Sequence, residues 1–461
     1  MTAEEKIQAL EKEVAFLRAL VFQLTSKVDM LTQENIELRK ELAFYKSGRD
    51  SSNSSMPPST DIKPPNRNLS LRKKGGKKPG GQKGHEGNTL QMNANPDEVI
   101  KHSPQECEAC GRNISRQDEQ MVSKGQLIEL PPIKPIYIEH QLYSRICICG
   151  HCTRASFPQG ISATIKYGAS VEATISYFHA RQYIPVQRMQ ELLSHLFGLP
   201  VSQSTVINII KRFAEKAIPT YLDIKDQIQK ANVVGSDETG CNVNGKNIWY
   251  WTWQNLAYTF IVLSNNRGEA TITDNFPKGF PNAILSHDRW AAQCLTNAFG
   301  HQLCLSHILR ELKGLDELYG HGWSTSMKEL FMDALELERN TKPERYAWIR
   351  KKAQKFEKRL TALLNRKLKE KHHKSIALQK GLLKHRDKIF QFLYHPEVPS
   401  DNNGSERAIR NIKVKQKISG QFRSADHAQF FAIIRSVIDT AIKQGMDIFT
   451  ELTRIARLRP E

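Results

Sequence analysis

The sequence predicts a multidomain α+β protein, and three observations support this prediction. The chain has 461 residues, longer than one compact core usually requires, and this length favours about three domains. Its pattern changes from a heptad repeat to a Ser/Pro/Gly-rich stretch, then to paired cysteines, and finally to mixed helical and strand periods. Hydrophobic residues make up 39% of the chain, which is enough to form packed cores.

Lysine and arginine outnumber aspartate and glutamate by 67 to 48, which gives a net charge of +19. This excess predicts a polyanionic partner, although charge alone does not distinguish DNA from RNA or from a membrane surface. We find neither a signal-peptide pattern nor a long apolar run, so we expect a cytosolic protein without a membrane partner. In that compartment the eight cysteines are not expected to form disulfides, and any closely spaced pairs indicate metal ligands.

The N-terminal segment repeats apolar positions in alternating steps of three and four. Ile7, Val14, Val21 and Val28 occupy a positions and leucine occupies most d positions, which favours a parallel two-stranded coiled coil. Asn35 falls at an a position, where a buried amide pair sets the register and favours two strands. The repeat predicts a dimerisation helix. The alternative is a lone amphipathic helix on the protein's own core.

A segment rich in Ser, Asn, Pro, Gly and Lys follows. Its first part has too little apolar surface to order itself and indicates a disordered linker. Its second part, LRKKGGKKPGGQKGHEG, is a basic tract suited to a phosphate backbone or a minor groove. The alternative is a solvated linker that happens to be basic. The candidate DNA contacts in this tract are Lys73, Lys74, Lys77 and Lys78.

Cysteines then flank a segment that we expect to be rich in strands. Cys107 and Cys110 form one pair, whereas Cys147, Cys149 and Cys152 offer three candidates for the second. Four thiolates at this spacing can surround Zn²⁺ tetrahedrally, which predicts a structural zinc ribbon that binds DNA. The alternative is unligated, buried cysteines.

The next stretch is helical by periodicity and resembles a helix-turn-helix. One apolar helix is expected to end near Gly198, and Ser202 is a good N-cap for a second helix. That second helix carries polar side chains suited to DNA contact: Gln203, Ser204, Asn208, Lys211 and Arg212. A small helical bundle without a DNA role is the alternative.

Strand patterns begin at Ala231 and carry two acids. Three consecutive strands, a helix starting near Glu269 and a fourth strand are expected, with Asp237 and Asp288 at the ends of the first and fourth strands. This order is the one expected of a ribonuclease-H-like α/β core. The tryptophans of NIWYWTW are expected to belong to the core.

A third acid, Glu406, lies in the first turn of a helix that follows the turn DNNG. Phosphodiester chemistry on two divalent cations about 4 Å apart requires carboxylate oxygens from distant parts of the chain. We therefore expect the carboxylates of Asp237, Asp288 and Glu406 to lie close together and to bind Mg²⁺ or Mn²⁺. The alternative for Glu406 is a helix N-terminal acid paired with Arg410. The candidate DNA contacts beside Glu406 are Arg407, Arg410 and Lys413.

Between the second and third acids lie LCLSHILREL and a long basic helical insertion. Cys304 and His307 have the spacing of half a metal site, but cysteine and histidine on an apolar helix usually serve packing. We expect them in the wall of the active site. The basic helices either line a DNA channel or are simply solvated.

At these residues the sequence resembles the transposases of the insertion-sequence-66 family, the large proteins of those bacterial mobile elements. GRDSSNSSMPPSTD and KKPGGQKGHEGNTL are similar to the family's linker and basic tract, and CICGHCTRASFP to its zinc knuckle. YIPVQRMQELLSHLFGLPVSQSTV is similar to its segment before the catalytic core. SDETG, SHDRW, LCLSHILREL and DNNGSERAIR then resemble its four central blocks, in order.

The resemblance implies a DDE mechanism in which Asp237, Asp288 and Glu406 hold the catalytic metal. It implies nicking at the element ends and attack of the freed 3′-hydroxyl on target DNA, with accessory proteins of the element as further partners. It also implies a bacterial, nucleoid-associated protein. Many relatives have Tyr near His287, although the acid itself is kept here. Glu238 follows Asp237 directly, and the sequence leaves it open as an additional ligand.

The similarity to the zinc knuckle selects Cys147 and Cys149 as the second ligand pair and leaves Cys152 as an extra thiol. Two other functions remain open on the sequence: a non-catalytic DNA-binding regulator, and a ribonuclease-H-like nuclease that cuts without joining. The expected domain boundaries follow the changes in pattern. They are 1–46 for the coiled coil, 47–104 for the linker, 105–160 for the zinc ribbon, 161–230 for the helix-turn-helix-like region, 231–425 for the core with its insertion at about 313–394, and 426–461 for a C-terminal helical segment.

Overall fold

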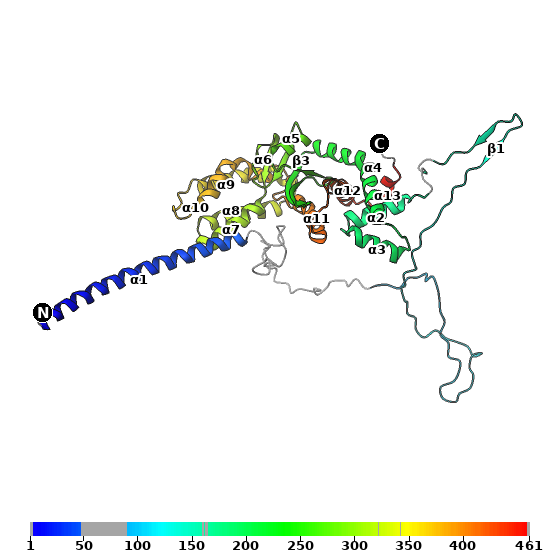
Figure 1. The fold of residues 1–461 in the computed structure, drawn as a ribbon, viewed down its shortest axis with the longest axis horizontal. Coiled ribbons are helices and arrows are strands. Elements are labelled where there is room, and N and C mark those ends of the chain that lie inside the picture. The colour runs from blue at the N-terminus through cyan, green and yellow to red at the C-terminus, as the bar shows by residue number, and fades with distance from the viewer. Residues whose placement is uncertain are drawn as a thin grey trace.

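The computed structural model of the chain describes residues 3–47, 90–158, 161, 165–320, 322–341 and 343–458 (Figure 1). Most of the expected linker, including the basic tract with Lys73, Lys74, Lys77 and Lys78, lies outside the described residues. None of the helices in the described part of the chain is long and apolar enough to cross a membrane.

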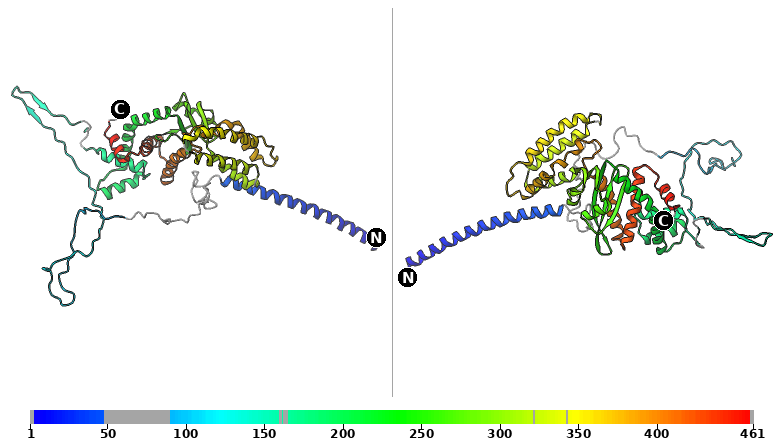
Figure 2. Two further views of the ribbon diagram at one scale, coloured as in Figure 1. Left: turned by 180° about the vertical axis from the view of Figure 1, so that it is seen from behind. Right: turned by 90° about the horizontal axis from the view of Figure 1, so that it is seen from above.

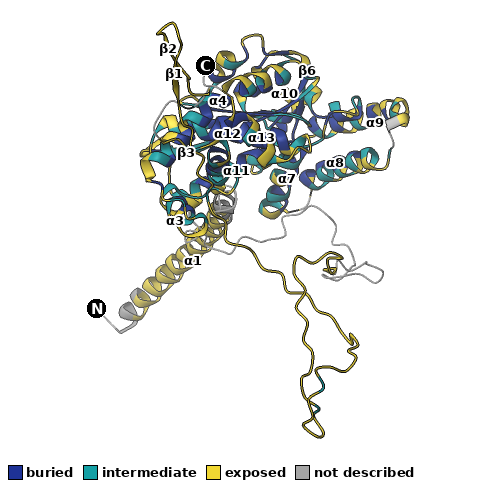
Figure 3. Cartoon of the chain, turned by 90° about the vertical axis from the view of Figure 1, so that its right-hand side faces the viewer, coloured by how far each residue is buried: buried dark blue, intermediate teal, exposed yellow. Residues whose placement is uncertain are grey.

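The N-terminal segment is one long helix, α1 (Ala3–Ser47), as the heptads predict. Its C-terminal end lies beside α7, and the rest of the helix projects away from the molecule (Figures 1 and 2). The side chains of its a and d positions are exposed wherever they are described, for example Val21 at 61% and Leu24 at 54%. The helix therefore presents an apolar seam that this single chain leaves uncovered (Figure 3).

The cysteine-bearing segment differs from the expected strand-rich ribbon. Two short strands, β1 (Ser144–Ile146) and β2 (Cys152–Arg154), form an antiparallel hairpin, and residues 125–143 form no strand. Nearly all side chains from 90 to 158 are exposed (Figure 3). A two-stranded ribbon without a packed face is only marginally stable, which explains why the apolar alternation here does not extend into a sheet.

Three helices form the helix-turn-helix-like region: α2 (Ala169–Ala180), α3 (Val186–Phe197) and α4 (Gln203–Gln229). The predicted boundaries between α3 and α4 are confirmed. Gly198 ends α3 in the left-handed conformation (φ 58°), and the hydroxyl of Ser202 caps α4 by accepting the N–H of Thr205. These helices share one buried cluster with the sheet and the C-terminal helices, so that they are not a separate domain.

The central sheet has five strands in the order β5-β4-β3-β6-β7. Its strands are β3 (Val233–Val243), β4 (Lys246–Gln254), β5 (Thr259–Ser264), β6 (Phe280–His287) and β7 (Ala298–Leu303). The first three form an antiparallel meander, and β6 and β7 run parallel to β3. The short helices α5 (Glu269–Asn275) and α6 (Ala291–Leu295) follow β5 and β6.

The position of Asp237 and the burial of one tryptophan differ from what the sequence predicts for this sheet. Asp237 lies in the middle of β3 rather than at its end, because pairing with β4 continues to Val243 and a tight turn at Asn244 and Gly245. Trp251 and Trp253 are fully buried and stacked, as expected of core residues, whereas Trp249 is only half-buried.

A helical insertion follows β7 and packs around its own hydrophobic core. It begins at Leu305, earlier than expected, and contains α7 (Leu305–Tyr319), α8 (Trp323–Arg339), α9 (Tyr346–Leu364), α10 (His373–Lys384) and three short 3₁₀ turns (Pro343–Arg345, Arg386–Lys388, Gln391–Leu393). The chain then returns to the sheet through α11 (Asn403–Ser419), α12 (Ala425–Lys443) and α13 (Ile448–Ala456). Figure 2 shows the insertion as a bundle at one end of the core.

Candidate active site

The sheet register brings Asp237 beside Asp288. In the parallel pairing of β3 with β6, Gly235 lies opposite Ser286, and two further residues along each chain lead to the two aspartates. Asp288 is the first residue after β6. Two acids 51 positions apart in sequence therefore lie side by side, where the carboxyl end of β6 meets the middle of β3.

The start of α11 is fastened to the same part of β3. The side-chain amide of Asn402 donates to the Ser236 carbonyl at 2.7 Å, and the Ser405 hydroxyl donates to Asn402 Oδ1 at 2.7 Å. Gly235 permits this approach, since a Cβ there would lie 2.4 Å from Gln254 Nε2 and 2.7 Å from Ser405 Oγ. Gly235 and Asp237 share a face of β3, so α11 presents Glu406 on the face that carries Asp237.

The turn before α11 is also tied to the neighbouring elements. The Asn402 N–H donates to Cys304 Sγ at 3.2 Å, and the Leu305 N–H donates to the Ser400 carbonyl at 3.0 Å. Burial raises the pKa of the Cys304 thiol to about 11. Cys304 thus holds the turn in place as a buried sulfur acceptor, in agreement with its expected place in the active-site wall.

Negative charge accumulates where these elements meet. Burial, followed by the charges of Asp288, Glu238 and Glu406, holds the pKa of Asp237 well above its ordinary value. Asp288 exerts the largest of these charge effects. Carboxylates crowded in this way favour a bound cation over mutual repulsion, and hard divalent ions prefer this donor type. The residues therefore fit the divalent metal that the sequence predicts.

Glu238 points to different partners. Arg267 donates to its Oε1 from two nitrogens, at 3.0 and 3.1 Å, and Gln293 donates to Oε2 at 3.1 Å. The Arg267 guanidinium lies between the rings of Trp249 and Trp290, with centroids at 4.6 and 3.7 Å. Burial and the charge of Asp288 raise the pKa of Glu238 to about 7 against the opposing effect of Arg267.

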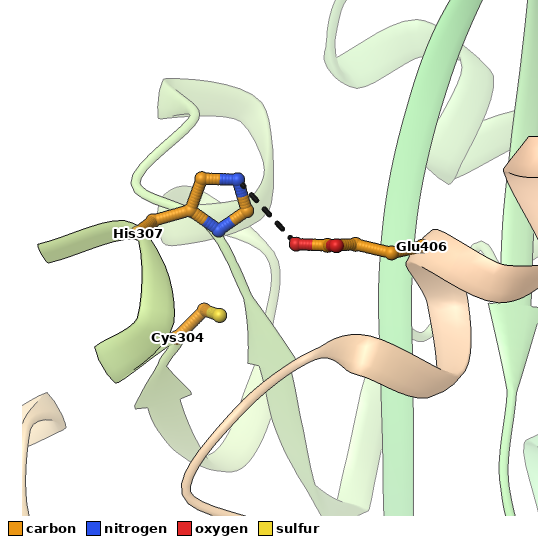
Figure 4. Close-up of side chains that lie close together, drawn as sticks. All are labelled: Cys304, His307 and Glu406. Carbon is orange, nitrogen blue, oxygen red and sulfur yellow. Dashed lines mark ion pairs between the residues drawn. The ribbon is translucent and has the colours of Figure 1, made fainter. Parts of the chain in front are cut away.

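Glu406 is surrounded by groups from α7 as well as by the aspartates. Arg310 Nη2 lies 2.9 Å from its Oε1, and His307 Nε2 lies 3.7 Å from the same oxygen. Arg410, the expected i+4 partner, is 3.9 Å from Oε2. Figure 4 shows Cys304, the residue before α7, and His307 in α7 facing Glu406.

The carboxylates of Asp237, Asp288 and Glu406 are less closely grouped than the sequence predicts. Among the described residues, the donor atoms that lie within 4.8 Å of one another in a group of three belong to Cys304, His307 and Glu406. The charges of Asp288 and Glu406 both act on Asp237, but the three carboxylates do not form such a group.

The basic residues near Glu406 that the sequence predicts as DNA contacts have two different environments. Arg407 and Arg410 are exposed and face solvent. Lys413 donates to the Gly240 carbonyl at 2.6 Å, and burial lowers its pKa. Lys413 therefore connects α11 to β3 in addition to any role with DNA. In the helix-turn-helix-like region, Arg212 forms an ion pair with the buried Glu172, at 2.6 Å.

Each predicted zinc knuckle has a tight turn. Gly111 donates its N–H to the Cys107 carbonyl and Gly150 donates to the Cys147 carbonyl, both at 2.8 Å and both from a left-handed glycine. Backbone amides and the neighbouring thiol lower the pKa of Cys107.

The thiol of Cys147 is affected in the same way by Cys149, whereas Cys152 belongs to β2. Within the described residues the two turns do not meet in one donor group. The cysteines of the predicted zinc site therefore lie in two separate turns.

Comparison with known families identifies two matches. The family model described as "Transposase IS66 family" matches residues 164–430, which is more than half of the chain. The model described as "Family of unknown function (DUF6444)" matches residues 3–91. No curated protein matches the chain.

Proposed function

The chain belongs to the IS66 transposase family, and we propose that it binds the ends of a bacterial insertion sequence, cleaves the DNA there and joins the freed 3′-hydroxyl to target DNA. The observation that carries this proposal is the arrangement of Asp237, Asp288 and Glu406. They come from β3, from the end of β6 and from α11, and the charges of Asp288 and Glu406 both act on Asp237.

The architecture around these acids supports a ribonuclease-H-like core. Three antiparallel strands are followed by two strands parallel to the first. The first of them, β3, is the central strand of the sheet and carries Asp237. The helical insertion lies between the second and third acids, as the sequence predicts. Such a core positions a catalytic carboxylate on the central strand and another at the end of its parallel neighbour.

Mg²⁺ or Mn²⁺ is the cofactor that suits the donor set. When bound, divalent cations activate the attacking oxygen and neutralise the charge that develops on the leaving oxygen. In this chain Asp237, Asp288 and Glu406 supply the oxygen ligands. Glu238 keeps Arg267 and Gln293 beside β3 and so supports the position of Asp237 from the opposite face of the strand.

The same proposal gives roles to the cationic surface. Arg407 and Arg410 are exposed next to Glu406, and they are suited to phosphates that flank the cleaved bond. On α4, Gln203, Asn208 and Lys211 are exposed and are suited to contact with the element end.

Assembly and zinc complete the proposal. Two copies of α1 form a parallel coiled coil through the uncovered seam, which pairs two element ends in one complex. Cys107, Cys110, Cys147 and Cys149 bind one structural Zn²⁺ once the two knuckle turns come together, and the DNA-binding ribbon then orders around it. The protein acts on bacterial DNA in the cytoplasm, together with accessory proteins of its element.

A strand-transfer assay tests the catalytic proposal. The full chain is incubated with a pre-cleaved end taken from the inverted repeat that flanks its gene, Mg²⁺ and a supercoiled plasmid. Wild type is expected to give joined product. Asp288→Asn and Glu406→Gln are expected to reduce joining about a thousandfold or more, because residues that act as one unit fail together. Asp333→Asn, which changes a surface acid of the insertion, is the matched control.

The two alternative functions give different results in the same assay. A nuclease would cleave an intact end but yield no joined product with wild type. A non-catalytic regulator would bind the end equally well as wild type, Asp288→Asn or Glu406→Gln, and would yield product with none of them. Either result would reject the proposal.

A further inference from the structure

Arg310 holds one oxygen of Glu406 in this structure. Its Nη2 lies 2.9 Å from Oε1, closer than His307 at 3.7 Å. Cys304, the residue before α7, and His307 and Arg310 within it follow one another at three-residue steps, so that each is about one helical turn from the next. The carboxylate is 20% exposed, and the contact is therefore partly shielded from water.

This contact conflicts with metal binding at the same atom. A guanidinium and a divalent cation are both positive, and both require the negative charge of Oε1. If Glu406 is a metal ligand, as proposed above, Arg310 has to release this oxygen when the metal binds. The conflict is specific to Glu406, because the carboxylates of Asp237 and Asp288 make no ion pair among the described residues.

Arg310 is held by fewer contacts than Arg267, although the two side chains are equally exposed. The Arg267 guanidinium lies over the rings of Trp249 and Trp290 and donates twice to Glu238. Arg310 has no such ring contact within the described part of the chain. Its Nε donates to the Ser306 carbonyl of its own helix at 3.2 Å, and its side chain is 41% exposed. Rotation about its side-chain bonds therefore breaks this hydrogen bond and the Glu406 contact but no stacking on an aromatic ring.

We infer that Arg310 is a positioning residue that holds Glu406 in the metal-free protein and transfers to a phosphate oxygen of bound DNA when the metal takes its place. The inference rests on the proposed function. The planar guanidinium matches a phosphate as well as a carboxylate, and both contacts are charge-assisted. A phosphate of bound DNA would supply the anion that Arg310 loses when a metal holds Glu406, so that neither charge would be left unpaired.

A different use of these side chains is a site for a thiophilic cation on Cys304, His307 and Glu406. Their donor atoms lie within 4.8 Å of one another. Two contacts speak against it: Asn402 already donates its N–H to Cys304 Sγ, and Arg310 occupies the shared oxygen of Glu406. Zn²⁺ affinity, measured by equilibrium dialysis of wild type and Arg310→Gln, distinguishes such a site from a Mn²⁺ site on the carboxylates.

The test measures metal affinity without DNA, and cleavage with DNA, on the full chain. Mn²⁺ binding is followed by the loss of the free-ion electron paramagnetic resonance signal for wild type, Arg310→Gln, Asp288→Asn and Arg359→Gln. The last is the matched control, since Arg359 forms an exposed ion pair with Asp333 at 3.0 Å. Thermal melting verifies that each variant is folded.

Arg310→Gln is expected to bind Mn²⁺ about threefold to tenfold more tightly than wild type, because a partly exposed ion pair no longer competes. Its cleavage of the element end at saturating Mg²⁺ is expected to fall about tenfold to a hundredfold, because a phosphate contact is lost. A purely structural role would lower both quantities. Arg359→Gln should change neither by more than about twofold.

Unchanged or weaker Mn²⁺ binding in Arg310→Gln would overturn the inference, and so would full cleavage activity. A gain in Zn²⁺ affinity without a gain in Mn²⁺ affinity would also overturn it and would assign Oε1 to the Cys304–His307 cluster. Asp288→Asn separates this failure from failure of the proposed function. If Asp288→Asn binds Mn²⁺ as tightly as wild type, the carboxylates are not the metal site at all.

Discussion

Arg267 donates two hydrogen bonds to a single oxygen of Glu238, at 3.0 and 3.1 Å, while its guanidinium is stacked between two tryptophan rings. Gln293 takes the other oxygen at 3.1 Å. Both oxygens of Glu238 are thus engaged on the side of β3 away from α11. These partners separate the role of Glu238 from that of Asp237. The sequence alone does not separate them, because the two acids are adjacent.

The first prediction concerns the metal ligands. Asp237→Asn is expected to weaken Mn²⁺ binding about a hundredfold, because a hard cation loses an anionic ligand. Glu238→Gln is expected to change it by less than about threefold, since its oxygens already have partners. The same titration without DNA measures both variants. Equal losses in the two variants would make Glu238 a ligand.

The second prediction concerns the close approach of α11 to β3. Gly235→Ala is expected to destabilise the protein by about 1–3 kcal/mol, because its Cβ would overlap buried, hydrogen-bonded atoms of Gln254 and Ser405. Cleavage should fall further than stability accounts for, since Glu406 shifts with α11. Urea unfolding followed by tryptophan fluorescence measures the stability.

Gly240→Ala is the control for this prediction in the same strand. A Cβ there would meet only the exposed side chain of Asn247 at 3.0 Å, which can move away. Its cost is expected to stay below about 1 kcal/mol. If the two variants prove equally stable, α11 is not held through Gly235.

The third prediction is a pH dependence of stability. Lys415 on α11 is buried, and burial lowers its pKa from an ordinary 10.5 to about 8. Between these values the unfolded chain binds the proton more tightly than the folded chain does. The contribution of Lys415 to the free energy of unfolding therefore rises as the pH increases from about 8 to 10.5, and it stays low below pH 8.

Lys415→Met should remove this rise, because methionine does not titrate. The free energy of unfolding of wild type is expected to gain on the order of 2–3 kcal/mol relative to the variant across that interval. Urea unfolding at pH 7.5 and 10 measures the difference. Lys417→Met, at an exposed position on the same helix, should leave the pH dependence of wild type intact.

The fourth prediction selects the zinc ligands. Cys149→Ser is expected to lose the bound zinc, about one ion per chain, because serine is a poor ligand for Zn²⁺ in a thiolate site. Cys152→Ser is expected to retain it, since Cys152 starts β2 and lies outside the pair formed by Cys147 and Cys149. Metal analysis after dialysis measures the content. Retention in Cys149→Ser with loss in Cys152→Ser would reverse the assignment.

The fifth prediction concerns the seam of α1. Leu24→Glu places a charge at a d position and is expected to dissociate the dimer at micromolar concentration. Phe22→Glu changes a more exposed apolar residue outside the seam and should leave the dimer intact. Sedimentation equilibrium measures the mass of each variant. A monomeric wild type would reject the coiled coil, whatever the variants do.

Local signals sufficed for several elements of this protein. The heptads determined the long helix α1. Gly198 and Ser202 marked the end of α3 and the start of α4 because caps act within one helical turn. The positions of Asp288 after β6 and of Glu406 in the first turn of α11 were likewise readable, since each depends on the few residues around it.

Long-range contacts decided the rest. The sequence ended the first strand near Asp237, but pairing with β4 extends it to Val243, because strand length depends on the partner as much as on the residues themselves. Similarly, no local pattern indicates that residues 125–143 lack a packing surface and form no strand.

The site shows the same division. The sequence determined which acids are present, and their resemblance to a family selected three of them. Only the tertiary structure decided that Arg267 takes Glu238 and that Arg310 takes Glu406, since these partners lie 29 and 96 residues away. Electrostatic pairing depends on distance in space, which the fold alone sets, and this is why the state of each carboxylate could not be read from the chain.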